Sequence, residues 1–269
     1  MNRVRATIFI LAAIFISFFL SRDALARFFW QKNGDARLAY FLNFSDADLA
    51  IQLGNYYFGN TAGKSEYNLK LAEKSFKKAV KIKDDILWGH YQLARIYFMN
   101  KDFDKALSEI NKELEFNPGN VRSFYIRGLI FAYRGDFLKS EEDFKNFVML
   151  MPKEWAGYND LAWVLAEQKK YQEAERVLVS AGREVLDADK NPWLLNGLGA
   201  ARLNLKKYST AAVSLERALK FAEELTERDW GRAYPGNDPR DAAGGLSQFV
   251  AAIKSNLAKA KNGAVDNGR

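Results

Sequence analysis

The sequence has no cysteine and one histidine, His90, among its 269 residues. Without cysteine the chain forms no disulfide, no thiolate metal site and no cysteine nucleophile, so its fold must depend on packing alone. One histidine without cysteine cannot build the usual zinc cluster or supply much material for catalysis. Adjacent carboxylates such as Glu141 and Glu142 point in different directions on a helix. We therefore expect no enzymatic activity, no metal and no cofactor.

Proline and low-complexity sequence are also scarce. The chain contains five prolines, 48% hydrophobic residues and 14% aromatic residues. This composition is typical of a chain that is folded over most of its length, with only the tail, residues 263–269, expected to be disordered. No strand pattern is evident, which also argues against a glycine-rich phosphate loop after a strand.

Acidic residues are fewer than basic ones, which gives a formal net charge of +7. A basic field attracts polyanions without specific contacts, so nucleic acid or an anionic surface must be considered. Lysines gather between Lys70 and Lys83, but carboxylates interleave elsewhere, as at Glu109, Glu113 and Glu115. The distribution favours a solvated outer helix face over a functional basic patch, and a nucleic-acid partner is not expected.

The longest apolar run lies near the N-terminus. Residues 6–21 are 16 consecutive uncharged, mostly apolar residues preceded by Arg3 and Arg5. A cleaved signal peptide would use the small residues Ala24 and Ala26, whereas an uncleaved anchor usually has about 20 apolar residues. Because no glycine or proline breaks the segment, we favour a transmembrane signal-anchor over residues 1–26, with cleavage near Ala26 and a buried helix as alternatives.

The orientation of this segment is ambiguous from charge alone. Four basic residues between Arg22 and Arg37 outnumber Arg3 and Arg5, which opposes a simple positive-inside assignment. A very short N-terminal tail before a large C-terminal domain favours the opposite arrangement. We expect the domain to lie outside the cytoplasm, in the cell envelope, or to be secreted if the chain is cleaved.

Aromatic residues recur at intervals of 34 positions, each followed three positions later by a small residue. These pairs are Phe103 with Ala106, Phe137 with Ser140, and Tyr171 with Ala174; Tyr208 with Ala211 follows after 37 positions. A fixed period of this length indicates helix pairs that stack to share one apolar core. Prolines at Pro118 and Pro152 end the second helix of a pair.

This pattern resembles the tetratricopeptide repeat (TPR) family over about 180 residues. The resemblance implies an all-α, right-handed superhelical solenoid of about five helix pairs. The apolar run adds an N-terminal membrane-engaging helix, and the last amphipathic segment adds a C-terminal capping helix. The predicted repeats of the 47–225 array are residues 47–86, 87–120, 121–154, 155–188 and 192–225. Residues 27–46 are expected to be a linker and half-repeat, 226–240 a loop, and 241–262 the capping helix.

In TPR proteins the first helix of each pair lines a concave groove. Carrying the inward-facing positions over gives a set of aromatic and polar candidates: Trp88, Tyr91, Arg95, Phe98, Arg122, Tyr125, Tyr133, Asn159, Trp163, Trp193 and Asn196. Tyrosine, tryptophan and arginine often carry interface binding energy, and asparagine can bond an extended backbone. The alternative is that some of these aromatic side chains only pack between repeats, as His90 is expected to do.

The predicted loop supplies three more candidates, Trp230, Arg232 and Tyr234, which either bind a partner or fasten the capping helix. The resemblance implies a non-catalytic adaptor that binds an extended peptide or helix of a protein partner. The lysines that clamp a C-terminal carboxylate in some TPR domains are missing. An accessory subunit that binds an anionic polymer or polysaccharide, and a self-assembling structural protein, remain alternatives.

Overall fold

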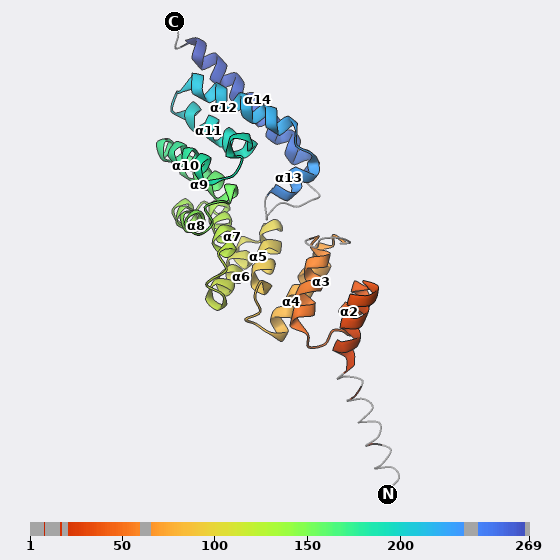
Figure 1. The fold of residues 1–269 in the computed structure, drawn as a ribbon. Helices are drawn as coiled ribbons and strands as arrows, with labels where there is room; N and C mark the ends of the chain where they lie inside the picture. The colour runs from red at the N-terminus through yellow and green to blue at the C-terminus, as the bar shows by residue number, and fades with distance from the viewer. Residues whose placement is uncertain (1–7, 9–16, 18–20, 60–65, 234–241, 267–269) are drawn as a thin grey trace. The chain divides into compact units, whose positions relative to one another are not determined.

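The computed structural model describes residues 8, 17, 21–59, 66–233 and 242–266, and none of these forms a β-strand (Figure 1). The chain divides into two compact units. The first unit comprises Met1–Ile96 with Glu115–Asn117, and the second comprises Tyr97–Leu114 with Pro118–Arg269. Each unit is a stack of antiparallel helices, as the periodic sequence predicts.

The first unit begins with a helical segment, residues 21–33, which is α-helical to residue 28 and continues as η1 (Phe29–Asn33). Next come α2 (Ala36–Leu42), α3 (Ala47–Tyr57), α4 (Leu69–Ile82) and most of α5 (Gly89–Met99). Side chains of Asp35, Asp46 and Asn68 accept the amide hydrogen of the residue three positions later. These caps satisfy helix-start amides and define where α2, α3 and α4 begin.

The predicted linker and half-repeat, residues 27–46, begin with helical structure. Residues 27–33 are helical, and the helix ends only at Gly34, whose φ of +64° suits a residue without a Cβ atom. Segment 21–33 packs against α2, so the predicted half-repeat is one helix of a complete pair. The stretch from Ser21 to Asn33 contains no glycine or proline, so nothing in its sequence ends the helix before Gly34.

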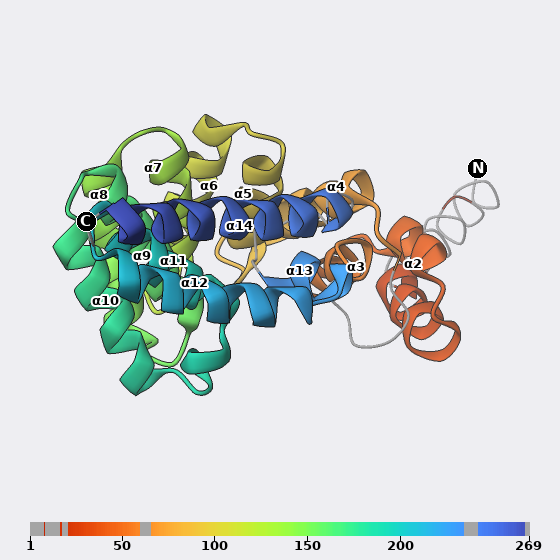
Figure 2. The ribbon, with the colours of Figure 1, turned by 90° about the horizontal axis from the view of Figure 1, so that it is seen from above.

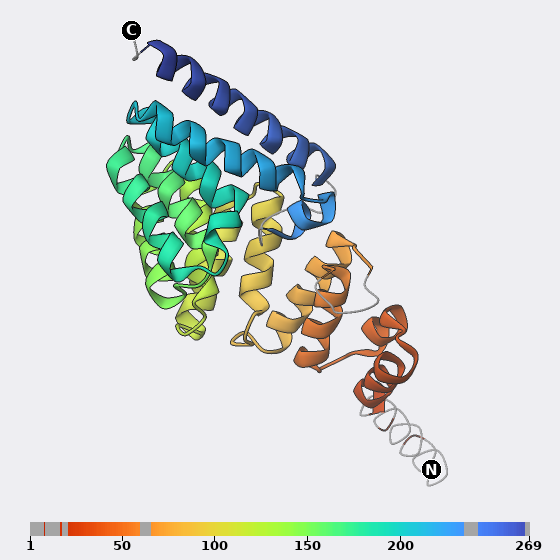
Figure 3. The same cartoon turned by 45° about the horizontal axis from the view of Figure 1, so that its top comes forward.

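The second unit contains four further pairs or parts of pairs. These helices are α6 (Phe103–Phe116), α7 (Arg122–Tyr133), α8 (Phe137–Leu150), α9 (Trp155–Glu167), α10 (Tyr171–Glu184), η2 (Ala188–Lys190), α11 (Pro192–Asn204) and α12 (Tyr208–Glu223). Neighbouring helices from α7 to α12 lie side by side (Figure 3). Except for η2, which lies between two repeats, these helices fall within the repeats that the 34-residue spacing predicts.

The turns inside the four pairs from α5/α6 to α11/α12 have the same backbone form. One residue there adopts a positive φ: Lys101, Gly135, Lys169 and Lys206. The next residue donates its amide hydrogen to the carbonyl five positions earlier, as Asp136 does to Phe131 and Lys170 does to Leu165. This is a Schellman ending, which satisfies helix-end carbonyls and reverses the chain.

Small residues set how closely two helices of a pair approach. A Cβ atom on Gly54 would lie 2.4 Å from the Phe76 ring, and one on Gly199 would lie 2.5 Å from Leu215. Phe76 and Leu215 have no exposed surface. The glycines therefore make room for the large residues that fill the interior of each pair.

The C-terminal region differs from the prediction in two places. Residues 227–233 of the predicted loop form α13 (Glu227–Ala233), because Thr226 and Asp229 bond each other reciprocally at its start. The last helix, α14 (Ala242–Asp266), includes the beginning of the predicted disordered tail. It lies beside α12 (Figures 2 and 3) and buries Ile253 and Ala260 against that helix.

Within the described part of the chain, no helix is both long enough and apolar enough to cross a membrane. The predicted signal-anchor lies outside the described residues, except for Ile8, Ser17 and the stretch from Ser21 onward.

Candidate partner-binding surface

Four aromatic residues from three successive predicted repeats form a connected cluster in the second unit. This aromatic cluster comprises Phe98, Phe103, Tyr133 and Trp163. The ring centroids of Phe98 and Tyr133 are 5.3 Å apart, those of Phe103 and Tyr133 are 6.1 Å apart, and those of Tyr133 and Trp163 are 5.8 Å apart. Such separations are typical of favourable aromatic pairs.

Local structure explains why these rings meet. Phe98 lies near the end of α5 and Phe103 begins α6, and the turn between them brings their ring centroids to 5.9 Å. Tyr133 is the last residue of α7 and is 59% exposed. Trp163 lies in α9, and its indole nitrogen donates a hydrogen bond of 3.1 Å to the exposed Glu167. The cluster is thus accessible at its centre.

Tyr125 is one candidate whose side chain is not exposed. It is 2% exposed, packs against Phe144 and Phe147, and donates its hydroxyl hydrogen to Asp160 over 2.6 Å. Asn159 donates to the other oxygen of Asp160. The expectation that Tyr125 contacts a partner is therefore corrected: the residue is part of the packing between α7 and α9.

The candidates of the first unit also contact one another. Tyr91 is 4% exposed, and its ring lies 5.2 Å from Trp88, whose φ of +72° is unusual for a bulky residue. The Arg95 guanidinium lies 4.5 Å from the Phe58 ring centroid. Because Tyr91 is buried, it cannot serve as an exposed anchor, and Arg95 is held over aromatic rings.

Trp193 is covered by the C-terminal helices. Its ring stacks on Trp155 at 4.8 Å, on Trp230 at 6.0 Å and on Phe249 at 5.7 Å. Trp230 comes from α13 and Phe249 from α14, so both helices are fastened to α9 and α11. This supports the structural interpretation of Trp230. The Arg232 side chain and Tyr234 lie outside the described part of the chain.

Two polar candidates lie apart from these aromatic groups. Arg122 is exposed and its guanidinium is 4.0 Å from the Glu154 carboxylate. Asn196 is half-buried on α11, and its Oδ1 atom is buried and accepts no hydrogen bond from the described residues. An unsatisfied acceptor of this kind suits a backbone N–H donor.

The His90 side chain is packed in the interior of the first unit. Its side chain is 1% exposed, stacks on Phe116 at 5.9 Å and approaches Asp84 at 3.2 Å. Among the described residues no group of three or more His, Cys, Asp or Glu could hold a metal ion.

Three residues that matter here are not among the predicted groove residues. Phe103 was recognised as a repeat mark but not as a member of the aromatic cluster, although it lies only five positions after Phe98. Trp155 stands one position outside the groove pattern, and Asp160 was not singled out. Burial raises the pKa of Asp160 to about 6, against the hydrogen bonds from Tyr125 and Asn159 that lower it.

Comparison with known proteins identifies the architecture. No family model matches the chain. It is 23% identical over 144 residues to the type IV pilus assembly protein PilF of Pseudomonas aeruginosa, which covers 54% of this chain and 57% of PilF. The chain thus spans less than two thirds of that relative.

Two solved structures are similar. One, a TPR protein from Parabacteroides merdae, has a TM-score of 0.58 at 19% identity and covers 91% of this chain and 93% of its own. YrrB, described as a TPR protein with an unusual peptide-binding site, has a TM-score of 0.55 at 16% identity and covers 70% and 92%. The predicted all-α solenoid is confirmed, and the chain has the fold of these tetratricopeptide-repeat proteins.

Proposed function

We propose that this chain is a non-catalytic scaffold that binds a segment of a partner protein through the aromatic cluster. The observation that carries the proposal is the continuity of Phe98, Phe103, Tyr133 and Trp163 across three repeats, with Tyr133 59% exposed at the centre. In the TPR pattern Phe98, Tyr133 and Trp163 all occupy positions that face the groove. A partner segment laid across these repeats would therefore meet one connected aromatic surface.

The chemistry of the cluster indicates what such a segment contains. Aromatic rings bind apolar side chains and contribute most of the energy of many interfaces. Glu167 lies beside Trp163 and is exposed, so a hydrogen-bond donor or a cation on the partner can pair with it. We propose an extended or helical segment with apolar residues and a flanking basic or amide group.

We further propose that the N-terminal apolar segment is retained and anchors the protein in a membrane of the cell envelope. Support comes from the residues that follow it. Ala26 has no exposed surface, and Asp23 and Arg27 on either side of it contact the turn before α3. Cleavage after Ala26 would remove Asp23 and its contacts to this turn, so the structure of the turn favours retention of the apolar segment. The similarity to a protein named for pilus assembly is consistent with an envelope scaffold.

Binding of an anionic polymer is the weaker alternative. Many basic side chains are within ion-pair distance of carboxylates, as Lys105 is of Asp102 and Lys254 is of Glu223. Such pairing lowers the local potential that a polyanion would experience.

The decisive experiment compares partner capture by the full-length protein and by Tyr133→Ala/Trp163→Ala. Crosslinking in the native host, purification through a tag and mass spectrometry identify partners, and their affinity is then measured. Removing two clustered aromatic side chains should weaken binding by about tenfold or more. Both residues border solvent, so circular dichroism and the melting temperature should change little.

The matched control is Leu138→Ala, because Leu138 is an apolar residue on α8 that is 73% exposed and lies in the second helix of its pair. It should leave capture unchanged. Equal capture by the folded double variant and by the wild type would exclude the aromatic cluster as the binding surface.

A further inference from the structure

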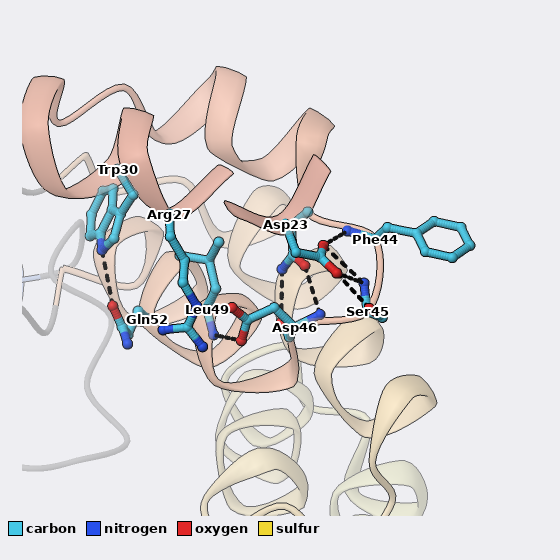
Figure 4. Close-up of polar contacts among 9 residues, drawn as sticks. Asp23, Arg27, Trp30, Phe44, Ser45, Asp46, Leu49 and Gln52 are labelled. Carbon is cyan, nitrogen blue, oxygen red and sulfur yellow. Dashed lines mark hydrogen bonds and ion pairs between the residues drawn. The ribbon is translucent and has the colours of Figure 1, made fainter. Parts of the chain in front are cut away.

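The start of the first unit is tied together by a carboxylate. The Asp23 side chain accepts hydrogen bonds from the amides of Phe44 and Ser45 and from the Ser45 hydroxyl (Figure 4). Partial burial would raise the pKa of Asp23, but these hydrogen bonds outweigh it and lower the pKa. The ionised carboxylate therefore holds the turn between α2 and α3 against the helical segment 21–33.

Two more contacts run along the same helix face. Arg27 forms an ion pair with Asp46, and the Trp30 indole donates to Gln52 over 3.0 Å (Figure 4). Positions 23, 27 and 30 share one helix face because they are separated by four and three residues. Segment 21–33 is thus a built-in part of the first unit.

Segment 21–33 and α2 form a helical hairpin. Large apolar side chains are exposed at the end of this hairpin where the predicted membrane segment joins. Phe41 is 72% exposed and Phe44 is 56% exposed. Arg22 connects them, since it donates to the Phe41 carbonyl over 3.0 Å and its guanidinium lies 5.6 Å from the Phe44 ring centroid. In Figure 4 the Phe44 ring points away from the helices.

The helical segment 21–33 exposes further apolar surface. Leu25 is 39% exposed and Phe28 is 51% exposed, and they lie three positions apart on the side opposite Asp23 and Arg27. We define the collar as Arg22, Leu25, Phe28, Phe41 and Phe44.

A second cation lies close to the collar. Lys78 donates to the carbonyls of Tyr40 and Asn43 at the end of α2. Burial first, and then repulsion from Arg22, lower the pKa of Lys78, and attraction to Asp23 offsets part of this effect. Arg22 and Lys78 therefore place two cations beside the single carboxylate of Asp23.

These features match a membrane interface. As a helix, the 16-residue apolar run would span about 24 Å, while a bilayer core is about 30 Å thick. A short span is compensated by apolar and aromatic residues beside it at the headgroup level, and basic side chains there attract anionic lipids. The collar provides both kinds of group: Arg22 follows the end of the run directly, and it contacts the Phe41 carbonyl and the Phe44 ring.

We propose that the collar is a membrane-contact surface that sits in the headgroup region of an anionic lipid bilayer. The occupant is lipid because Arg22 follows directly after the apolar run and the collar combines this basic group with exposed aromatic rings. This inference rests on the membrane anchoring proposed above but does not depend on the aromatic cluster or its partner.

The absence of cysteine makes a direct test possible. Full-length Phe44→Cys, labelled with an environment-sensitive fluorophore, is reconstituted into vesicles of phosphatidylethanolamine and phosphatidylglycerol, with or without lipids that carry a headgroup-level quencher. The control is Lys70→Cys, an exposed position on α4 about 12 Å along the helix from Lys78. Circular dichroism verifies that both variants are folded.

We expect a blue-shifted emission and at least twofold quenching at position 44, with water-like emission and little quenching at position 70. Adding Phe41→Ser should reduce the quenching at position 44. If the protein floats with the vesicles but gives water-like emission at position 44, the membrane contact of the collar is refuted while the proposed anchor stands. Protein that fails to float refutes the anchor and the collar together. A blue shift without lipid quenching, increasing with the protein-to-lipid ratio, would assign the surface to a second copy instead.

Discussion

At the scale of single residues, Asp160 is the most unusual group in the second unit. It is 5% exposed, and its two oxygens accept hydrogen bonds from Tyr125 and Asn159. No cation is among the causes of its pKa shift, so desolvation dominates and the pKa rises to about 6. By contrast, Glu141 is also partly desolvated, but bonds from Lys145, Lys170 and Gln168 lower its pKa to about 2. At Glu141 the cationic partners outweigh desolvation, whereas Asp160 has no such partner among the causes of its shift.

The raised pKa of Asp160 predicts a pH-dependent stability. Because the folded pKa of about 6 exceeds the unfolded value of 3.8, this residue's stabilising contribution is complete below pH 3.8 and is lost as the pH rises through 6. Between pH 5 and 7.5 the wild type should lose roughly 1 kcal/mol that Asp160→Asn does not lose. Urea unfolding of both proteins at the two pH values measures this difference. Parallel pH dependence in the two proteins would contradict the assignment.

At the scale of elements, successive repeats reuse the same contacts. Glu141 on α8 pairs with Lys170 before α10, at 2.8 Å, and Glu175 on α10 pairs with Lys207 before α12, at 2.6 Å. Glu141 and Glu175 are 34 positions apart, so the repeat period extends to the ion pairs between neighbouring repeats. The final element departs from this scheme, because α13 and α14 are fastened by the rings of Trp230 and Phe249 on Trp193.

Trp230→Ala should therefore release α13 and the beginning of α14. We expect about 1–3 kcal/mol lower stability at this end, since a half-buried tryptophan loses less than a fully buried one. Hydrogen exchange should become faster in α13 and in the first turns of α14 but not in α7 or α8. The exposed neighbour Arg228→Ala on the same helix serves as the control. Unchanged exchange in Trp230→Ala would show that the stack does not hold these helices.

At the scale of the whole molecule, the net positive charge and the proposed partner binding depend on different residues. The chain carries a net charge of +7, yet the proposed binding surface is aromatic. Ion pairs such as Lys145 with Glu141 and Arg127 with Asp143 place part of the positive charge beside carboxylates. Specific binding should therefore depend on apolar contact more than on the electrostatic field.

This separation predicts a weak salt dependence. Between 50 and 300 mM salt, affinity for the captured protein partner should change by less than about threefold, whereas an interaction driven by many ion pairs would fall by orders of magnitude. Isothermal titration at both salt concentrations tests this, with heparin as an anionic polymer for comparison. A steep loss of partner affinity would favour the polymer-type alternative over the aromatic cluster.

The sequence by itself determined the helix pairs of the array, because each depends on local signals. Small residues that let paired helices approach repeat every 34 positions, and prolines and Schellman turns reverse the chain between helices. Each of these signals affects the backbone only within about ten residues of its own position. The segment 21–33 could also have been predicted, since Ser21 to Asn33 contains no helix breaker.

Only the tertiary structure decided which aromatic residues are available. Tyr125 and Tyr133 both occupy predicted groove positions on α7, but Tyr125 is buried against Asp160 while Tyr133 lies on the surface. Trp193 is covered by Trp230, 37 positions later, and Asp23 is matched to Ser45, 22 positions later. Exposure is the result of contacts between segments distant in the sequence, so no local pattern contains it.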